Sequence, residues 1–253
     1  MRRLSALAIF AALLFFADQP ARAGSPFADW AAIIVAGDDH AHSGAHSEVF
    51  DNARRDLTTA FAKAGFAREH ISQFSVQPNH DRQRTVLRSD PPTIAGELGR
   101  LAGNAKSGCL VYFTSHGSPD GIVLGDGGLT PSAMARMVDD ACAERPAVVV
   151  VAACYSGVFI PPLAGPDRMV LTAARPDRAS FGCGEADRYT FFDACMLEQL
   201  PLAHNFAALA RAVQACVAKR ERDLGAEPPS EPQVWIGPAL APDLPLLAFS
   251  APP

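Results

Sequence analysis

The chain has 253 residues, a formal net charge of −5 and 49% hydrophobic residues, which is enough for one α/β domain with a sizeable core. The mild acidity, and the lack of a basic patch with interleaved aromatic residues, argue against nucleic acid as a partner. After residue 23 no stretch is long and apolar enough to cross a bilayer, so we expect no stable membrane anchor.

The first 23 residues have the pattern of a secretory signal peptide. Residues 2 and 3 are arginines, residues 4–16 form a short apolar core, and residues 21–23 read Ala-Arg-Ala, a cleavage site between small residues. The alternative is a buried N-terminal helix. Cleavage there leaves residues 24–253, with a formal charge of −7, as a single domain with a proline-rich, irregular C-terminal tail. We therefore predict export, either to the periplasm or to the extracellular medium.

Apolar, β-branched runs alternate with amphipathic stretches along the rest of the chain. In chain order we predict strand 30–37, helix 47–66, strand 71–78, helix 93–102, strand 109–117, hairpin 121–129, helix 130–142, strand 147–153, strand 168–174, helices 189–200 and 205–224, and strand 234–237. Ser47 and Thr130 are the expected N-caps of their helices. This alternation favours a three-layer α/β sandwich, a mostly parallel sheet of about six strands with helices on both faces.

Functional sites in such sheets form outside the carboxyl ends of the strands, so the residues that follow each strand are the candidates. Two of these positions, after the third and fourth predicted strands, hold His116 and Cys154. A thiol beside an imidazole can act as a nucleophile, and the imidazole can then give a proton to a departing amine. The backbone N–H groups of Gly117 and Cys154 are candidates for an oxyanion hole. The alternative is a buried structural cysteine and a core histidine with satisfied hydrogen bonds.

Three short segments match one family pattern. Residues 112–117 read Tyr-Phe-Thr-Ser-His-Gly, residues 152–157 read Ala-Ala-Cys-Tyr-Ser-Gly, and residues 171–181 contain Thr-Ala-Ala-Arg-Pro followed by Ala-Ser-Phe. In order and spacing they resemble the legumain family of cysteine peptidases (peptidase family C13, caspase-like clan CD). The resemblance implies a caspase-hemoglobinase-like fold and an endopeptidase that acts on peptides or proteins without a cofactor. It also implies that His116 is the catalytic histidine and Cys154 the nucleophile.

The pocket for the substrate side chain departs from the family pattern. Legumains have a glutamate two residues before the nucleophile, where this chain has Ala152, and only His46 remains of their Asn-Tyr-Arg-His segment. Ser180 matches a pocket serine. The resemblance thus implies that His46, Ala152 and Ser180 contact the substrate, and it carries catalysis over better than asparagine specificity. Glu185 and Asp187 could select a basic side chain or lie in a solvated loop.

The six cysteines leave the disulfide pattern open. If Cys154 is a working thiol, an odd number remains and at least one more cysteine stays unpaired. Cys109 opens an apolar strand and is predicted to be a buried, inert thiol. Cys142, Cys195 and Cys216 lie at predicted helices beside apolar residues, which favours structural roles, paired or free.

Residues 37–48 offer three histidines and three carboxylates in one segment. Such groups can bind zinc or another divalent ion, but the segment lacks a fixed metal-ligand spacing. Because it follows the first strand and should border the cleft, substrate contact is the favoured interpretation. We predict no metal site and no cofactor.

The sequence thus predicts an exported cysteine endopeptidase that hydrolyses peptide bonds through Cys154, His116 and an acyl-enzyme. Two alternatives stay open at this point. One is a transamidase or peptide ligase, which passes the same acyl-enzyme to an amine. The other is a non-catalytic binding protein that keeps the fold. The cleavage-site preference and the oligomeric state do not follow from the sequence.

Overall fold

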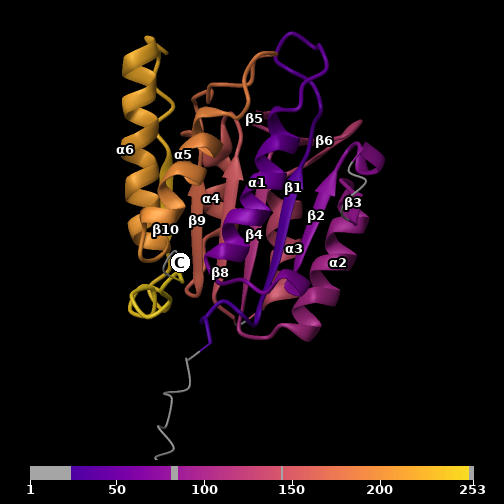
Figure 1. The fold of residues 1–253 in the computed structure, drawn as a ribbon, viewed down its shortest axis with the longest axis vertical. Helices are drawn as coiled ribbons and strands as arrows, with labels where there is room; N and C mark the ends of the chain where they lie inside the picture. Colours follow the sequence, from indigo (N-terminus) through magenta and orange to yellow (C-terminus); the bar gives the residue numbers. More distant parts are fainter. Residues whose placement is uncertain (1–23, 81–84, 144, 251–253) are drawn as a thin grey trace, which may run out of the picture.

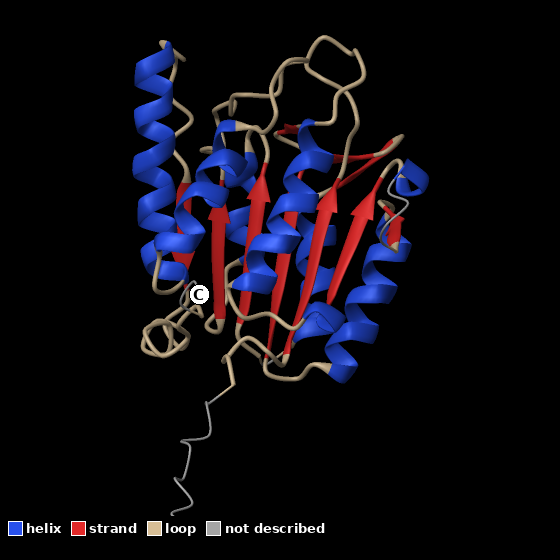
Figure 2. Ribbon diagram, in the orientation of Figure 1, coloured by secondary structure: helices blue, strands red, loops and turns tan. Residues whose placement is uncertain are grey.

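The computed structural model describes residues 24–80, 85–143 and 145–250, and the predicted signal peptide lies outside these residues. Within them, a central sheet of seven strands has the order β10-β9-β8-β4-β1-β2-β3 (Figures 1 and 2). Neighbouring strands are parallel, except that β10 runs antiparallel to β9. The strands are β1 (Trp30–Ala36), β2 (Ile71–Ser75), β3 (Val86–Arg88), β4 (Gly108–Thr114), β8 (Ala147–Ala152), β9 (Arg168–Thr172) and β10 (Gln233–Ile236). This arrangement confirms the predicted mostly parallel sheet.

Two local features differ from the predictions. The edge strand β3 is a seventh strand, which the sequence does not reveal because three residues are too few to show an alternating pattern. Helix α1 begins at Val49 with Glu48 as its N-cap, whereas the Ser47 hydroxyl accepts the backbone N–H of Val49 at 3.3 Å. Thr130 is the N-cap of α3, as predicted, and its hydroxyl accepts a backbone N–H of the first turn.

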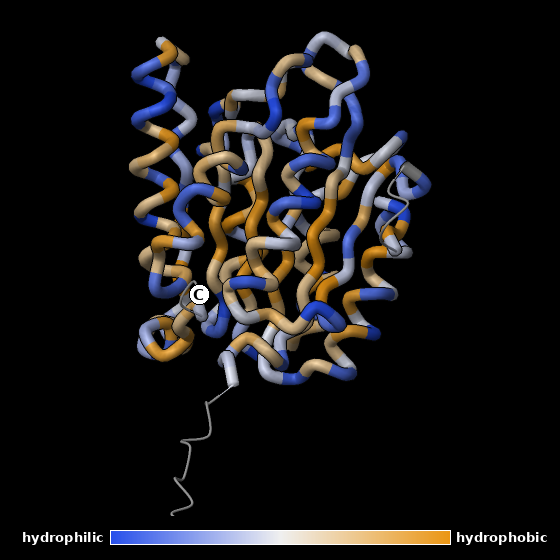
Figure 3. The backbone as a smooth tube through the Cα atoms, in the orientation of Figure 1, coloured by the Kyte–Doolittle hydropathy of each residue, from blue (hydrophilic) through white to orange (hydrophobic). Residues whose placement is uncertain are grey.

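Helices cover both faces of the sheet. On one face lie α1 (Val49–Lys63), α5 (Phe191–Gln199) and α6 (Phe206–Leu224), and on the other α2 (Pro91–Asn104), α3 (Pro131–Cys142) and α4 (Ile160–Leu163). Alternate residues of each strand enter the two cores, so Ile34 of β1 packs on the first face and Ile33 on the second. Because both faces are covered, the central strands are apolar along their whole length, as the orange tubes of Figure 3 show.

A second, small sheet follows β4. It consists of β5 (Gly117–Ser118), β6 (Gly121–Leu124) and β7 (Gly127–Leu129), all antiparallel, and it contains the predicted hairpin. Short 3₁₀ helices span Arg68–His70, Pro78–His80, Ser156–Phe159 and Leu200–Leu202. Residues 237–250 form turns, from which Leu240 and Leu244 pack into the core. In the described part of the chain, no helix is long and apolar enough to span a bilayer.

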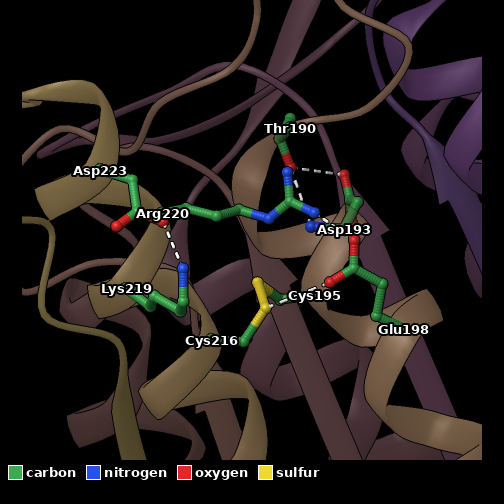
Figure 4. Close-up of a disulfide and its surroundings, with 8 residues drawn as sticks. All are labelled: Thr190, Asp193, Cys195, Glu198, Cys216, Lys219, Arg220 and Asp223. Carbon is green, nitrogen blue, oxygen red and sulfur yellow. Dashed lines mark hydrogen bonds and ion pairs between the residues drawn. A yellow bond between two sulfur atoms is a disulfide. The ribbon is translucent and has the colours of Figure 1, made fainter.

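One disulfide joins a strand to a helix, and a second joins two helices. Cys109 at the start of β4 is bonded to Cys142 at the end of α3, so the prediction that Cys109 is a free, inert thiol is wrong. Its side chain lies on the face of the sheet that α3 covers. The two cysteines are 33 residues apart in the chain, so their pairing depends on the tertiary packing and cannot be read from the sequence. Cys195 of α5 is bonded to Cys216 of α6, as Figure 4 shows. Both bonds agree with the structural roles predicted for Cys142, Cys195 and Cys216.

Candidate active site

His116 and Cys154 lie just past the ends of two adjacent strands. Strands β4 and β8 pair in parallel as far as Thr114 and Ala152, and the Ser115 N–H continues the ladder to the Ala152 carbonyl at 3.2 Å. Each of the two residues follows its strand by two positions, and both are half-buried. The parallel pairing therefore puts a histidine and a cysteine side by side at the carboxyl edge of the sheet.

The backbone of Gly117 touches the backbone of Cys154. A Cβ atom on residue 117 would lie 2.3 Å from the Cys154 carbonyl oxygen and 2.9 Å from the Cβ of Ala153. Real Cβ atoms do not approach so closely, so only glycine fits here without a shift of the backbone. The two residues predicted to supply oxyanion donors are consequently in contact.

The chain turns sharply at the cysteine. Tyr155, the next residue, has φ 57°, a left-handed conformation that is uncommon for a residue with a side chain. Its N–H donates to the carbonyl of Arg178 at 2.7 Å, which fixes the turn against the segment after β9. Gly157 completes the turn, because a Cβ there would lie 2.5 Å from the nitrogen of Pro176. Because of this turn, Cys154 is half-buried, whereas the strand before it is buried.

Three polar atoms of Ser180 lie close to the sulfur of Cys154. The backbone N–H of Ser180 donates to the sulfur at 3.3 Å, and its carbonyl and hydroxyl oxygens lie 3.5 Å and 3.6 Å from the same atom. The sulfur thus accepts a hydrogen bond from a backbone N–H and lies within reach of two oxygen atoms of the same residue. The structure therefore brings the predicted pocket serine into direct contact with the predicted nucleophile.

The imidazole of His116 has other partners. Nε2 lies 3.1 Å from the carbonyl oxygen of His40, and because a carbonyl can only accept, this contact assigns the ring proton to Nε2. The ring also packs edge-on against Phe50 of α1, with centroids 5.1 Å apart. Among the described residues, no hydrogen bond joins His116 to Cys154, so each side chain is held by its own wall of the site.

The other two predicted substrate contacts lie in different surroundings. Ala152 is the last residue of β8, is 2% exposed and packs in the core beneath α1, α5 and α6. His46 is exposed on the loop after β1, with Nδ1 3.6 Å from an oxygen of Asp39 and Nε2 4.0 Å from one of Glu48. Of the three predicted contact residues, Ser180 is the one that touches Cys154.

Two loops join to form one wall of the site. The His42 N–H donates to the carbonyl of Cys183 at 3.1 Å, and the Ser43 hydroxyl donates to Glu185 at 2.6 Å. The Cys183 side chain packs against Ala36, Val49 and Phe50. His40 belongs to the segment that the sequence predicts at the border of the cleft, whereas Phe50 and Cys183 are not predicted as neighbours of the candidate pair. The position of Cys183, three residues after the pocket serine, is the one signal that could have indicated it.

The acidic loop after β1 brings together Asp38, Asp39 and His40, whose side-chain donor atoms all lie within 4.8 Å of one another. They could offer three ligands to a metal ion. The His40 Nδ1 instead lies 2.8 Å from Asp38 and 3.2 Å from Asp39, and Gln77 donates to Asp39 at 2.9 Å. The hydrogen bond that His40 donates to Asp38, and then the charge of Asp39, raise the pKa of His40. These contacts are those of an internally bonded polar loop.

A buried carboxylate supports the strand that leads to His116. Asp193 of α5 is fully buried and accepts from Tyr112 at 2.7 Å, Thr114 at 2.6 Å and Thr190 at 2.8 Å. Burial raises the pKa of Asp193, against the lowering effect of these hydroxyl donors, and it raises the pKa of Tyr112 as well. Figure 4 shows Thr190 and Asp193 close to the disulfide of α5. The end of β4 is thus fastened to α5.

The fold and the pair of residues at its carboxyl edge define a class, the caspase-like α/β proteins with a cysteine and a histidine at adjoining strand ends. The chain belongs to the peptidase C13 family, whose profile matches residues 32–207, and this confirms the resemblance to legumain-like proteins. Family membership and fold support a function of the cysteine peptidase type.

A solved structure shares the fold. The chain is similar to the crystal structure of caspase-1 from Spodoptera frugiperda, with a TM-score of 0.61 and 16% identity, over 92% of this chain and 94% of that one. At this identity the similarity concerns the fold alone. Among curated protein sequences, none matches the chain significantly.

Proposed function

We propose that the chain is a cysteine endopeptidase in which Cys154 attacks the peptide carbonyl and His116 protonates the departing amine. The observation that carries this proposal is the meeting of the two residues at the ends of β4 and β8 in a chain of the peptidase C13 family. Water then releases the acyl group from Cys154.

Each step has a local physical basis. The Ser180 N–H, 3.3 Å from the sulfur, stabilises the thiolate, and the backbones of Gly117 and Cys154 are the proposed donors to the oxyanion. With its proton on Nε2 facing the His40 carbonyl, His116 has Nδ1 as the atom that takes the thiol proton and later gives one to the leaving amine. Phe50 limits rotation of the ring.

Export of the protein is part of the proposal. The two disulfides support it, because such bonds persist mainly in oxidising compartments such as the periplasm and the extracellular medium. The basic start, apolar core and cleavage site of residues 1–23 are the second support. Detection of the protein in the periplasmic or culture fraction, with a new N-terminus at residue 24, tests this part.

A cleavage profile tests the peptidase. The protein and its Cys154→Ala variant are incubated separately with a diverse peptide mixture under reducing conditions, and the products are identified by mass spectrometry. We expect cuts with the wild type alone, clustered after one type of residue. Cuts after basic residues would assign a role to Glu185 or Asp187, which lie in the loop after Ser180.

The same products separate the outcomes. Hydrolysis adds water to each fragment, whereas ligation joins a fragment to an added amine. Cuts that persist in the Cys154→Ala variant, or cuts that are missing from both proteins although both are folded, would overturn the peptidase proposal.

A further inference from the structure

Cys183 is the second free cysteine, besides Cys154, in the part of the chain that the structure describes. The other four cysteines form the two disulfides at a distance from the carboxyl edge, within helices and strand starts. Cys154 and Cys183 are therefore free thiols in a chain whose other cysteines are paired. Both lie at the carboxyl edge of the sheet, which suggests that they act together.

The backbone brings Cys183 into the wall around the Cys154 sulfur. Ser180, which donates to and accepts from that sulfur at 3.3 Å and 3.5 Å, precedes Cys183 by three residues. Between them Gly182, with φ 86°, turns the chain back. Cys183 also packs against the small buried cluster of Ala36, Val49 and Phe50, and the Phe50 ring of this cluster packs on His116. Cys183 thus lies beside the nucleophile and beside the support of the histidine.

The two sulfur atoms also interact electrostatically. Burial raises the pKa of Cys183, and the negative charges of Cys154 and then of Asp187 raise it further. A charge shifts the pKa of another group in this way only at short range. Cys183 accordingly stays a protonated thiol, which is slow to react with oxidants, while Cys154 has an N–H donor for its thiolate.

We propose that Cys154 and Cys183 form a reversible disulfide when the site meets a peroxide, so that Cys183 is the resolving thiol of the nucleophile. The Cys154 thiolate attacks one peroxide oxygen, the O–O bond breaks, and a sulfenic acid and hydroxide form. The Cys183 sulfur then attacks the Cys154 sulfur, the S–O bond breaks, and the Cys183 proton leaves with the hydroxyl group as water. The two sulfur atoms together lose two electrons, which the peroxide gains.

The bond has a defined effect. It removes the nucleophile and protects Cys154 from further, irreversible oxidation to the sulfinic and sulfonic acids. It forms when the Cα atoms of the two residues come within about 4.4–6.8 Å, and residues 180–188 contain neither helix nor strand that would resist this approach. A dithiol reductant reverses it by exchange. The loss of activity rests on the proposed function, whereas the bond itself does not.

Peptide mapping tests the bond. The full protein, with both thiols reduced under conditions that leave the two structural disulfides intact, is treated with hydrogen peroxide, alkylated and digested without a reductant. We expect a cross-linked pair of peptides that contain Cys154 and Cys183, about 2 Da lighter than their sum. The Cys195–Cys216 peptide serves as an internal control, since it should be present before and after treatment. Cys154 oxidised to sulfinic acid beside an alkylated Cys183 would overturn the proposal.

The Cys183→Ser variant gives the second readout. Its fold is checked by its Tm and its two structural disulfides. After enough peroxide to oxidise a lone thiol beyond the sulfenic acid, wild-type cleavage should fall to a small fraction of its untreated rate and return with dithiothreitol. The variant, compared with its own untreated rate, should fall and stay low. Recovery in the variant equal to that of the wild type would overturn the proposal. If the wild type cleaves no peptide at all, the proposed function fails, and the peptide map still decides on the bond.

Discussion

Six consecutive residues of β8 are buried. Two residues past the end of this strand lies the half-buried thiol of Cys154, and the next residue, Tyr155, turns the chain through a left-handed conformation. The same strands therefore have two roles, one in the interior and one at the carboxyl edge of the sheet. Burial on both faces stabilises the strands, while their last residues fix where His116 and Cys154 stand. Variants in the interior should therefore change the stability of the fold, and variants at the carboxyl edge should change the activity.

The largest effect is expected for His116→Ala. Removal of the imidazole should lower kcat/KM by about 10²–10⁴-fold, because the leaving amine loses its proton donor. Tm should change little, since the ring is half-buried and lies at the sheet edge. Peptide cleavage and thermal unfolding are measured on the same preparation. His204→Ala, at an exposed histidine before α6, is the matched control, and equal losses in the two variants would contradict the role of His116.

The opposite result is expected in the core. Phe61→Ala should lower the free energy of unfolding by about 3–5 kcal/mol, because this residue of α1 is fully buried in the core and its loss leaves a cavity. At a temperature where the variant is folded, kcat/KM should stay close to wild type. Denaturant titration and cleavage assays check both. A large loss of activity in the folded variant would show that the interior and the edge are not separable.

Removing the Cys195–Cys216 disulfide should cost about 3 kcal/mol of unfolding free energy, since the bond closes a loop across 21 residues of the unfolded chain. The change is Cys195→Ser together with Cys216→Ser, followed by denaturant titration. The Cys109→Ser, Cys142→Ser pair, which spans 33 residues, is the comparison and should lose a similar amount. An unchanged midpoint in the first variant would mean that α5 and α6 are held by packing alone.

Gly117→Ala adds a single carbon atom at the carboxyl edge of the sheet. The new Cβ would lie 2.3 Å from the Cys154 carbonyl, so the backbone must shift at the proposed oxyanion donors. We expect kcat/KM to fall by about 10²-fold, the effect of losing one such donor. Gly99→Ala in α2, where a Cβ meets open space, is the control and should stabilise the helix by about 0.5–1 kcal/mol with activity retained. Full activity of Gly117→Ala would exclude this part of the site.

The smallest effect concerns Asp193, where core and edge meet. Its raised pKa means that the folded state binds the proton more tightly, so its contribution favours folding at low pH and declines as pH rises from the ordinary value of 3.8 through the raised one. The slope of stability against pH is at most about 1.4 kcal/mol per pH unit for one group. Asp193→Asn should lack this slope, and Asp243→Asn, at an exposed turn, should retain it. Identical slopes in both variants would contradict the assignment.

The sequence predicts the regular part of the molecule well. Six strands of the sheet, the helices on both faces apart from the short α4, and the hairpin after β4 follow from runs of apolar residues and from turn residues, which act locally. The adjacency of His116 and Cys154 follows as soon as two consecutive strands are taken as parallel neighbours. These features depend on residues that are close in the chain.

What the sequence does not reveal depends on residues far apart in the chain. Cys109 pairs with Cys142, Asp193 binds hydroxyls of β4 about 80 positions earlier, and His42 meets Cys183 through the backbone. Each contact depends on how loops and helices pack on the sheet, and the hydrophobic periodicity of the sequence does not predict that packing. The short strand β3 is missed for another reason, because its signal is too brief.

The Cys109–Cys142 bond has one more consequence. It closes a covalent ring that contains β4, His116, the whole hairpin sheet and α3. A protease that nicked the turn between β6 and β7, at Gly125 or Asp126, would therefore yield two polypeptides that remain one molecule. The two pieces would travel together on a gel until a reductant released them, and the histidine and the cysteine of the site would stay joined although they lay on separate chains.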